Sequence, residues 1–309
     1  MQAPELSVDG IGWTGFIQSA EMPSPGSHTP FRASGTIQLM REIRFSIDRD
    51  WARAAHGASG FEGALPVTNS WGGWPSAVGV APYLMLRIVV SGEPDATTGY
   101  LVNIQVLDEL LRRYAIPAAA RALAVRGVSL TIERLLADIF AEVAGRVPKG
   151  CQLESLTLAA TPYLSSRIDG RRPGMVELTQ SFEFSASHRL HVASLSDEAN
   201  RRVFGKCNNP NGHGHNYEVR VTVGGELTAD RGTVVEVPHF ESVVKREVID
   251  RLDHKHLNSD VAEFASVNPS VENIARVIWG FLEAPLKPAR LLRVRVYETA
   301  KTYAEYAGE

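Results

Sequence analysis

The chain has 309 residues, 44% hydrophobic and 22% charged, a composition that predicts an ordinary globular protein long enough for two domains. Its formal net charge of −3 gives no electrostatic reason to expect nucleic acid as a partner. No apolar run approaches about 18 residues, the N-terminus lacks a signal-peptide pattern, and the two cysteines make no disulfide framework. We therefore expect no membrane span and a cytoplasmic location.

Two segments interrupt the chain. Residues 1–36 are rich in Gly, Pro and Ser and show no sustained periodicity, which predicts an extension or a long loop. Residues 168–174, IDGRRPG, are polar and turn-forming and predict a linker. We therefore expect one domain over 37–167 and another over 175–309.

These two parts resemble one another in sequence, with matched positions 133 to 139 residues apart. A near-constant offset is typical of a duplicated domain. Each copy is predicted to read strand, strand, helix, helix, strand, strand. The matched positions are Gly92 with Gly225, Glu133 with Glu272, and Ala160 with Glu298.

In the second copy, alternating apolar residues predict strands over 176–187, 214–224, 233–237 and 291–298. Pro238 is suited to the first position of a helix, and an apolar stripe continues from there to Leu252. Ser270 is a plausible N-cap for a second helix.

Three histidines share the apolar face of the first two of these strands. His188 continues the phase of Phe184, and His213 and His215 continue the phase of Tyr217. Because strand side chains alternate between faces, all three imidazoles are expected to point inward. The pattern predicts a three-histidine zinc site with an open fourth position, as in a catalytic centre.

Cys207 lies six residues before His213, in a loop rich in Asn, Pro and Gly. It could be a small apolar filler, a fourth and structural zinc ligand, or a thiolate that acts as a base. Asp253 and His254 follow the first helix of the second copy; they could be a surface pair or a proton relay in which the carboxylate supports the imidazole.

Glu298 continues the buried phase of Val294 and Val296. A buried carboxylate is costly unless it is paired, and a ligand with two N–H donors would satisfy both oxygens. Alternatively, the strand ends at Tyr297 and Glu298 is solvated.

Five motifs, in order, resemble the 6-pyruvoyl-tetrahydropterin synthase family over residues 175–309: FSASHRL, FGKCNNPNGHGHNY, LDHKHLN, PSVENIA and VYETAKTYAEYAGE. The resemblance implies an α+β protein of two tandem tunnelling-fold domains, each a four-stranded antiparallel sheet with two helices on one face. In that family three units form a twelve-stranded barrel, and two such rings stack. A homo-oligomer is therefore implied, with a trimer of two-copy chains imitating the six-unit assembly.

The resemblance also implies a chemistry. A zinc-dependent lyase would convert 7,8-dihydroneopterin triphosphate to 6-pyruvoyl-tetrahydropterin and release triphosphate. The implied roles are zinc ligation by His188, His213 and His215, base catalysis by Cys207, proton relay by Asp253 and His254 from a neighbouring subunit, and pterin anchoring by Glu298.

Other readings stay open. The related 6-carboxy-tetrahydropterin synthases of queuosine biosynthesis usually have a shorter step from the cysteine to the paired histidines, so the six residues from Cys207 to His213 favour the pyruvoyl enzyme. A non-catalytic, zinc-stabilised pterin-binding protein would not need the relay. A zinc hydrolase would need a carboxylate base near the histidines, which Cys207 does not supply.

The first copy departs from the family at every site position. It is predicted to bind no zinc and to act as barrel wall, with Trp71 available to line a neighbouring site. Alignment puts Arg49 in place of His188, Trp74 near Cys207, Val80 and Pro82 in place of His213 and His215, and Ala160 in place of Glu298.

Overall fold

A computed structural model describes residues 35–47, 82–227 and 232–308. By its internal contacts the chain divides into residues 1–35 and 36–309, and the fold below belongs to the second unit. Nearly all of the predicted extension, together with Arg49, Trp71, Trp74 and Val80, lies outside the described residues. Across the described ranges, every helix is too short or too polar to cross a membrane.

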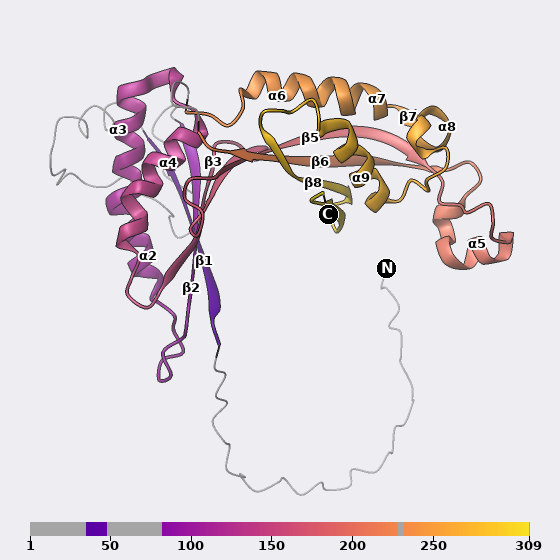
Figure 1. The fold of residues 1–309 in the computed structure, drawn as a ribbon. Helices are drawn as coiled ribbons and strands as arrows, with labels where there is room; N and C mark the ends of the chain where they lie inside the picture. The colour runs from indigo at the N-terminus through magenta and orange to yellow at the C-terminus, as the bar shows by residue number, and fades with distance from the viewer. Residues whose placement is uncertain (1–34, 48–81, 228–231, 309) are drawn as a thin grey trace, which may run out of the picture. The chain divides into compact units, whose positions relative to one another are not determined.

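The elements before the predicted linker make up what we call the first half (Figure 1). Its helices α2 and α3 are joined by a π-helical turn, Leu111–Ala115. The elements in chain order are β1 (Ile37–Ser46), β2 (Tyr83–Gly92), α2 (Ile104–Leu110), α3 (Ile116–Arg126), α4 (Ile132–Val143), β3 (Gln152–Ala159) and β4 (Leu164–Asp169).

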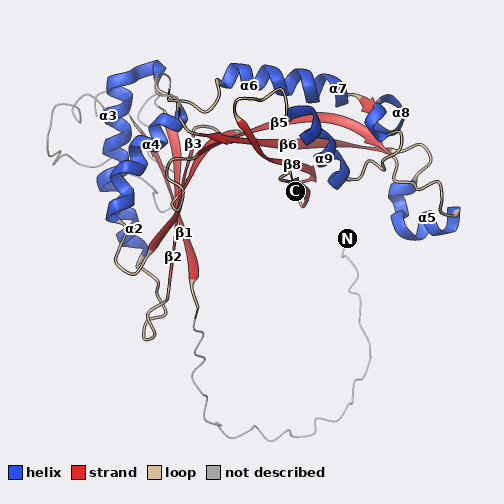
Figure 2. Cartoon of the chain, in the orientation of Figure 1, coloured by secondary structure: helices blue, strands red, loops and turns tan. Residues whose placement is uncertain are grey.

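The second half follows the same plan with more short insertions (Figure 2). A π-helical turn, Lys245–Ile249, again continues its first long helix. The elements are β5 (Val176–His188), α5 (Asp197–Phe204), β6 (His213–Gly225), α6 (Val237–Val244), α7 (Asp250–Leu252), β7 (Lys255–His256), α8 (Leu257–Asp260), α9 (Val271–Leu282), β8 (Arg290–Thr299) and β9 (Thr302–Tyr306).

One sheet runs through both halves in the order β1-β2-β3-β4-β5-β6-β8-β9, with β7 beside β5. Every neighbouring pair along this path is antiparallel, while β7 is parallel to β5. Helices and an antiparallel sheet confirm the α+β class. The junction is direct: β4 pairs with β5 from Leu164↔Gln180 to Ile168↔Val176.

The predicted linker therefore forms the turn of a β-hairpin. Gly170 donates its backbone N–H to Glu154. A Cβ on Gly170 would lie 1.9 Å from the carbonyl oxygen of Leu153, so only glycine fits where the chain turns over β3.

The helices pack on one face of the sheet. In α4 the buried positions Leu135, Leu136 and Ile139 recur at helical spacing, and in α9 Ile274 and Ile278 do the same. They meet the inward residues of the strands in two apolar clusters that share Ile132 and Val234 at their border. Burying each such side chain contributes about 1.5–3 kcal/mol.

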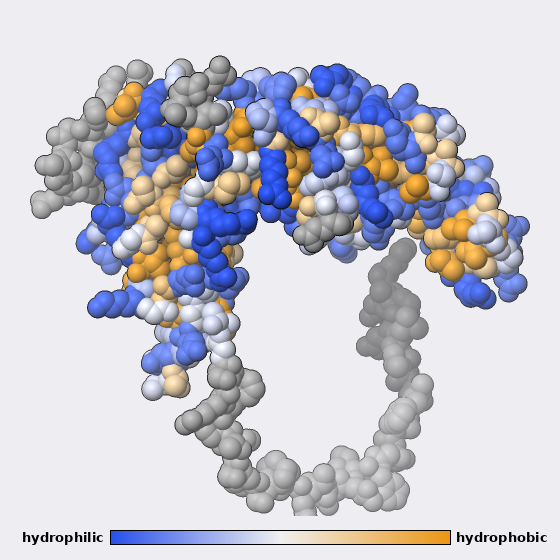
Figure 3. Space-filling view, viewed as in Figure 1, coloured by the Kyte–Doolittle hydropathy of each residue, from blue (hydrophilic) through white to orange (hydrophobic). Residues whose placement is uncertain are grey.

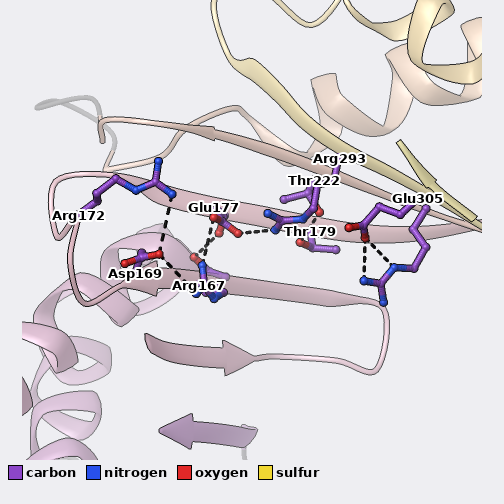
Figure 4. A network of polar contacts seen from close by, with 10 residues as sticks. Arg167, Asp169, Arg172, Glu177, Thr179, Thr222, Arg293 and Glu305 are labelled. Carbon is purple, nitrogen blue, oxygen red and sulfur yellow. Dashed lines mark hydrogen bonds and ion pairs between the residues drawn. The ribbon is translucent and has the colours of Figure 1, made fainter. Parts of the chain in front are cut away.

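The opposite face of the sheet is polar where the two halves meet (Figure 4). Glu177 of β5 accepts from Arg167 of β4 at 3.2 Å and from Arg293 of β8. Thr179 and Thr222 hydrogen bond across β5 and β6 at 2.9 Å. This network joins strands of both halves by contacts that do not depend on the apolar core.

Several landmarks recur at matching places in the two halves. A register shift falls between Val89 and Val90 in the β2–β3 pairing, and another falls 133 residues later in the β6–β8 pairing. Helices α4 and α9 each have 12 residues, and their N-caps, Thr131 and Ser270, each accept a hydrogen bond from a backbone N–H in the first turn. The N-cap prediction for Ser270 is confirmed.

The predicted strand 233–237 is wrong. The Thr233 hydroxyl and the Val234 N–H both donate hydrogen bonds to the side chain of Glu133 on α4. These bonds to a carboxyl group take the place of the backbone hydrogen bonds that a strand would make. Helix α6 begins at Val237, one residue before the predicted Pro238. In place of the predicted strand, β9 is the fourth strand that the second half adds to the main run of the sheet, and it pairs with β8.

Exposed apolar side chains gather over β1, β2 and α2 (Figure 3). Their exposed fractions reach 52% at Met40 and 65% at Tyr100. The other large apolar side chains exposed on these elements are Ile37, Tyr83, Ile104 and Val106.

Candidate metal centre and active site

Strand register brings the three predicted histidines together. His188 ends β5 and pairs directly with His213, the first residue of β6, while His215 lies two residues further on the same face. One ring nitrogen from each lies within 4.8 Å of the others. The three side chains can therefore hold one metal ion.

His188 is prepared as a neutral ligand. It is fully buried, and its Nδ1 donates to the carbonyl oxygen of Pro269 at 2.7 Å, which leaves the Nε2 lone pair free. Burial, followed by the neighbouring imidazoles, lowers the pKa of His188 to about 4. Its Nε2 lies 3.1 Å from Nε2 of His213, as two ligands of one ion would.

The other two imidazoles carry buried nitrogens without partners. Among the described residues, neither Nδ1 of His213 nor Nε2 of His215 has a hydrogen-bond partner. Burial and the nearby His215 lower the pKa of His213. Because an unpaired buried polar atom costs roughly 1–3 kcal/mol, a metal on Nε2 of His215 would remove such a cost. This donor set fits zinc.

Glu298 points into the same centre. Its Oε1 lies 3.4 Å from Nε2 of His188 and 3.5 Å from Nε2 of His215. Strand β8 runs on to Thr299, so the alternative that the strand ends at Tyr297 is wrong. The Glu298 side chain is 22% exposed, and its carboxylate faces the imidazoles rather than open solvent.

Cys207 lies close to this group. It sits in the 3₁₀ turn Gly205–Asn208, and its carbonyl oxygen accepts from Leu190 N–H at 2.9 Å. Burial first, then the charges of Glu298 and Cys207, raise the pKa of Tyr217 well above its usual range. The Tyr217 hydroxyl is 3.4 Å from Nδ1 of His188. Tyr217 therefore belongs to the site, although the sequence showed it only as part of an apolar phase.

Asp253 and His254 form the expected pair at the edge of β5. Asp253 accepts from the Ser185 N–H at 2.8 Å, and its second oxygen lies 2.8 Å from Nδ1 of His254. The Ser185 N–H first, and His254 second, lower the pKa of Asp253. The His254 side chain is 82% exposed, and within the described ranges no hydrogen bond or ion pair links the pair to the three histidines.

A cavity of about 610 Å³ adjoins this pair and is lined in part by His254, His256 and Ser185. Ser185 hydrogen bonds to Asn216 across the strands, and both alternate to the face opposite His188. The lining also includes Ala186 and His215 of the inward phase, so the cavity borders both the relay pair and one of the three histidines. His256 also acts on this centre, because its charge affects His188 and its own Nδ1 is buried without a partner in the described part of the chain.

Comparison with known proteins places the similarity in the second half. The family model described as 6-pyruvoyl tetrahydropterin synthase matches residues 177–309. The human 6-pyruvoyl tetrahydrobiopterin synthase is 44% identical over 140 residues, which cover 45% of this chain and 97% of the human protein. The 6-carboxy-5,6,7,8-tetrahydropterin synthase of Aquifex aeolicus is 28% identical over 43% of this chain and 98% of its own length.

Among solved structures, the Caenorhabditis elegans 6-pyruvoyl tetrahydropterin synthase shares 37% identity, covering 44% of this chain and 96% of that one with a TM-score of 0.42. Fold, site and relatives together define the class of protein as a lyase with a histidine centre able to hold a metal. The chain belongs to the 6-pyruvoyl tetrahydropterin synthase family.

Proposed function

We propose that the second half is a zinc-dependent lyase that converts 7,8-dihydroneopterin triphosphate to 6-pyruvoyl-tetrahydropterin with elimination of triphosphate. The observation that carries this proposal is the convergence of three imidazoles, one of them held neutral by burial. The 44% identity to the human synthase over nearly its whole length supports the choice of reaction.

Zinc is the metal we propose, because neutral imidazoles at tetrahedral spacing suit it. When bound, it supplies Lewis-acid chemistry that makes protons near a coordinated hydroxyl more acidic. His188, His213 and His215 would hold it, and the hydrogen bond from His188 to Pro269 fixes the tautomer that ligation needs.

The remaining residues bind the substrate and move protons. Cys207 is the proposed general base, since its thiol lies close enough to influence Tyr217 beside the histidines. Glu298 is the proposed pterin anchor, accepting a ring N–H and an amino group in bidentate fashion. Asp253 and His254 are the proposed relay. The His254 side chain is exposed, which leaves it available to a neighbouring subunit's site, and it also lines the cavity that reaches His215.

The second candidate is 6-carboxy-tetrahydropterin synthase, which the similarity to the Aquifex protein favours. Both reactions release triphosphate, so the pterin product separates them. Full-length protein with zinc at one ion per chain is incubated with dihydroneopterin triphosphate, and products are identified by mass spectrometry. The pyruvoyl pterin supports the proposal, the carboxy pterin replaces it with the second candidate, and no released triphosphate overturns both.

We also propose that the chain is a tandem duplication whose first copy, 37–167, has lost the site, with 168–174 joining it to the second copy, 175–309. The register shifts 133 residues apart and the paired capped helices support this history. Ala160 follows β3 where the second copy carries Glu298. The first copy would then supply sheet but no metal site.

A homo-oligomer in the cytoplasm completes the proposal. Within the described residues, β1 and β9 each have one strand neighbour, and their directions allow β9 of one copy to pair antiparallel with β1 of the next. Such pairing would bring a neighbouring chain against β1, where Ile37 and Met40 are exposed. Both cysteines are free thiols, in keeping with a reducing compartment.

A further inference from the structure

We infer that Glu298 is the fourth metal ligand of the substrate-free protein, so that the centre rests closed, with three imidazoles and one carboxylate. Substrate would open it by taking the place of the carboxylate. This inference rests on the metal binding proposed above and does not depend on which reaction follows.

Three of the separations between donor atoms are close to those of a four-coordinate ion, and the three imidazole nitrogens all lie within 4.8 Å of one another. With metal–ligand bonds of about 2.0–2.1 Å, two ligands of a tetrahedral zinc site lie about 3.3–3.4 Å apart. The Nε2 atoms of His188 and His213 are 3.1 Å apart. Oε1 of Glu298 lies 3.4 Å from Nε2 of His188 and 3.5 Å from Nε2 of His215. The carboxylate therefore lies beside two of the three imidazole nitrogens at separations that two ligands of one ion would have.

The chemistry of the contacts also fits a cation. Since Nδ1 of His188 donates to Pro269, its Nε2 presents a lone pair to the Glu298 oxygen. Two acceptors facing each other at 3.4 Å repel unless a positive charge lies between them. The Nε2 of His215 is buried, lacks a hydrogen-bond partner in the described residues and lies 3.5 Å from the same carboxylate oxygen, so one cation could contact both atoms.

Strand β8 aims the carboxylate at this point. Glu298 continues the inward phase of Val294 and Val296, both fully buried. The register of β8 against β9 shifts between Tyr297 and Thr299, which places an irregularity at this residue. Because the adjacent Tyr297 pairs with both β6 and β9, the backbone of Glu298 has less conformational freedom than that of a loop residue.

A closed centre makes release of Glu298 a condition for substrate entry. A ligand that offers only a hydroxyl must compete with a carboxylate for the ion. A ligand that also offers two adjacent N–H donors gives the displaced carboxylate a new partner, and thus recovers part of the lost ligation. The same residue would then select for amino-substituted heterocycles such as pterins over simple diols.

Cobalt substitution tests this without any turnover, because Co²⁺ in a zinc site absorbs visible light according to its coordination. Full-length protein, Glu298→Gln and the control Glu305→Gln are loaded with Co²⁺ and titrated with azide. Glu305 sits on β9, 33% exposed and paired with Arg295. We expect azide to change the spectrum of Glu298→Gln, which has an open position, at concentrations that leave wild type and the control unchanged.

Metal affinity gives the second measurement. In competition with a chelator, zinc should bind Glu298→Gln at least about tenfold more weakly than wild type, the loss expected when a metal's supporting carboxylate is removed. Equal affinity in the two proteins, or azide binding to wild type as strong as to the variant, overturns the inference.

The outcomes separate this inference from the proposed function. Protein that binds neither cobalt nor zinc overturns both. If Glu298→Gln binds metal more weakly than wild type, and the wild-type protein releases no triphosphate, the inference is supported and the proposed reaction is ruled out. If Glu298→Gln fails to fold, the azide titration of the wild-type protein still tests the inference. A wild-type cobalt spectrum that azide changes readily would overturn it.

Discussion

Glu133 of α4 lies 2.7 Å from the hydroxyl of Thr233, a residue 100 positions further along the chain. The same carboxyl oxygen accepts the Val234 N–H at 3.3 Å. Glu133 is 1% exposed, and its second oxygen has no partner among the described residues. A single carboxyl group thus ties a helix of the first half to the segment that leads into α6.

Burial raises the pKa of Glu133 from 4.5, against the opposing effect of its hydrogen bonds, and nearby Glu236 adds to the rise. Because the folded state holds this proton more tightly, its contribution is complete below pH 4.5 and is lost as pH rises through the raised pKa. Glu133→Gln should therefore gain stability relative to wild type as pH increases above 4.5. Thermal melts at several pH values check this, and parallel curves for the two proteins would contradict it.

Removing one imidazole should abolish tight metal binding. With two histidines left, His213→Ala is expected to lose at least about tenfold in zinc affinity and to emerge from chelator dialysis with little zinc. His239→Ala, at an exposed position of α6, is the matched control and should keep the wild-type metal content. Elemental analysis of the three proteins decides; equal zinc in His213→Ala and His239→Ala would mean the metal site lies elsewhere.

Loss of the thiol should remove turnover without removing metal. Cys207→Ala is expected to slow triphosphate release by roughly 10²–10⁴-fold, the range for a lost general base, while zinc content stays constant. The chain offers its own control in Cys151→Ala, a half-buried residue packed against the core of the first half. A Cys207→Ala protein as active as the Cys151→Ala protein would rule out the base.

The charge network between the halves should matter for stability. Glu177→Ala removes the acceptor shared by Arg167 and Arg293, whose side chains are a third exposed, and should cost about 1–3 kcal/mol in unfolding free energy. Glu263→Ala breaks an exposed pair with Arg251 and should cost under about 1 kcal/mol. Denaturant titrations compare the two, and equal small losses would show that the network does not hold the junction.

If subunits share active sites, two inactive variants should rescue each other. Cys207→Ala lacks the base and His254→Ala lacks the relay, so a mixed oligomer would contain some sites with both groups intact. The variants are unfolded together, refolded together and assayed for triphosphate release. Activity no higher than that of the separate variants would place base and relay in one chain.

Much of the second half could be predicted from side-chain phase. Alternation put His188, His213 and His215 of β5 and β6 on one face, whereas in β8 the register shift makes Leu291 rather than Leu292 a buried residue. Ser270 was recognisable as an N-cap because Ser before an apolar periodic run is a strong local signal. These features depend on neighbours a few residues away.

Features set by distant partners could not be predicted. Residues 233–237 have the β-branched composition of a strand, but Thr233 and Val234 donate their hydrogen bonds to the side chain of Glu133. The sequence of residues 168–174 suits a linker and a hairpin turn equally well. Only the pairing of β4 with β5 shows that the segment forms a turn. The approach of Glu298 to His188 likewise depends on how β8 is placed beside β6.

The hairpin between β4 and β5 also restricts how many strands a closed barrel can contain. The described part of each chain contributes eight strands to one continuous run, so whole chains would add these strands in eights. Two chains would give sixteen and three would give twenty-four. A ring of twelve, the number that three single units provide, would require one chain to be split between rings at this hairpin. A closed barrel built from whole chains would therefore be a wider circle than the twelve-stranded ring that the family resemblance implies for single units.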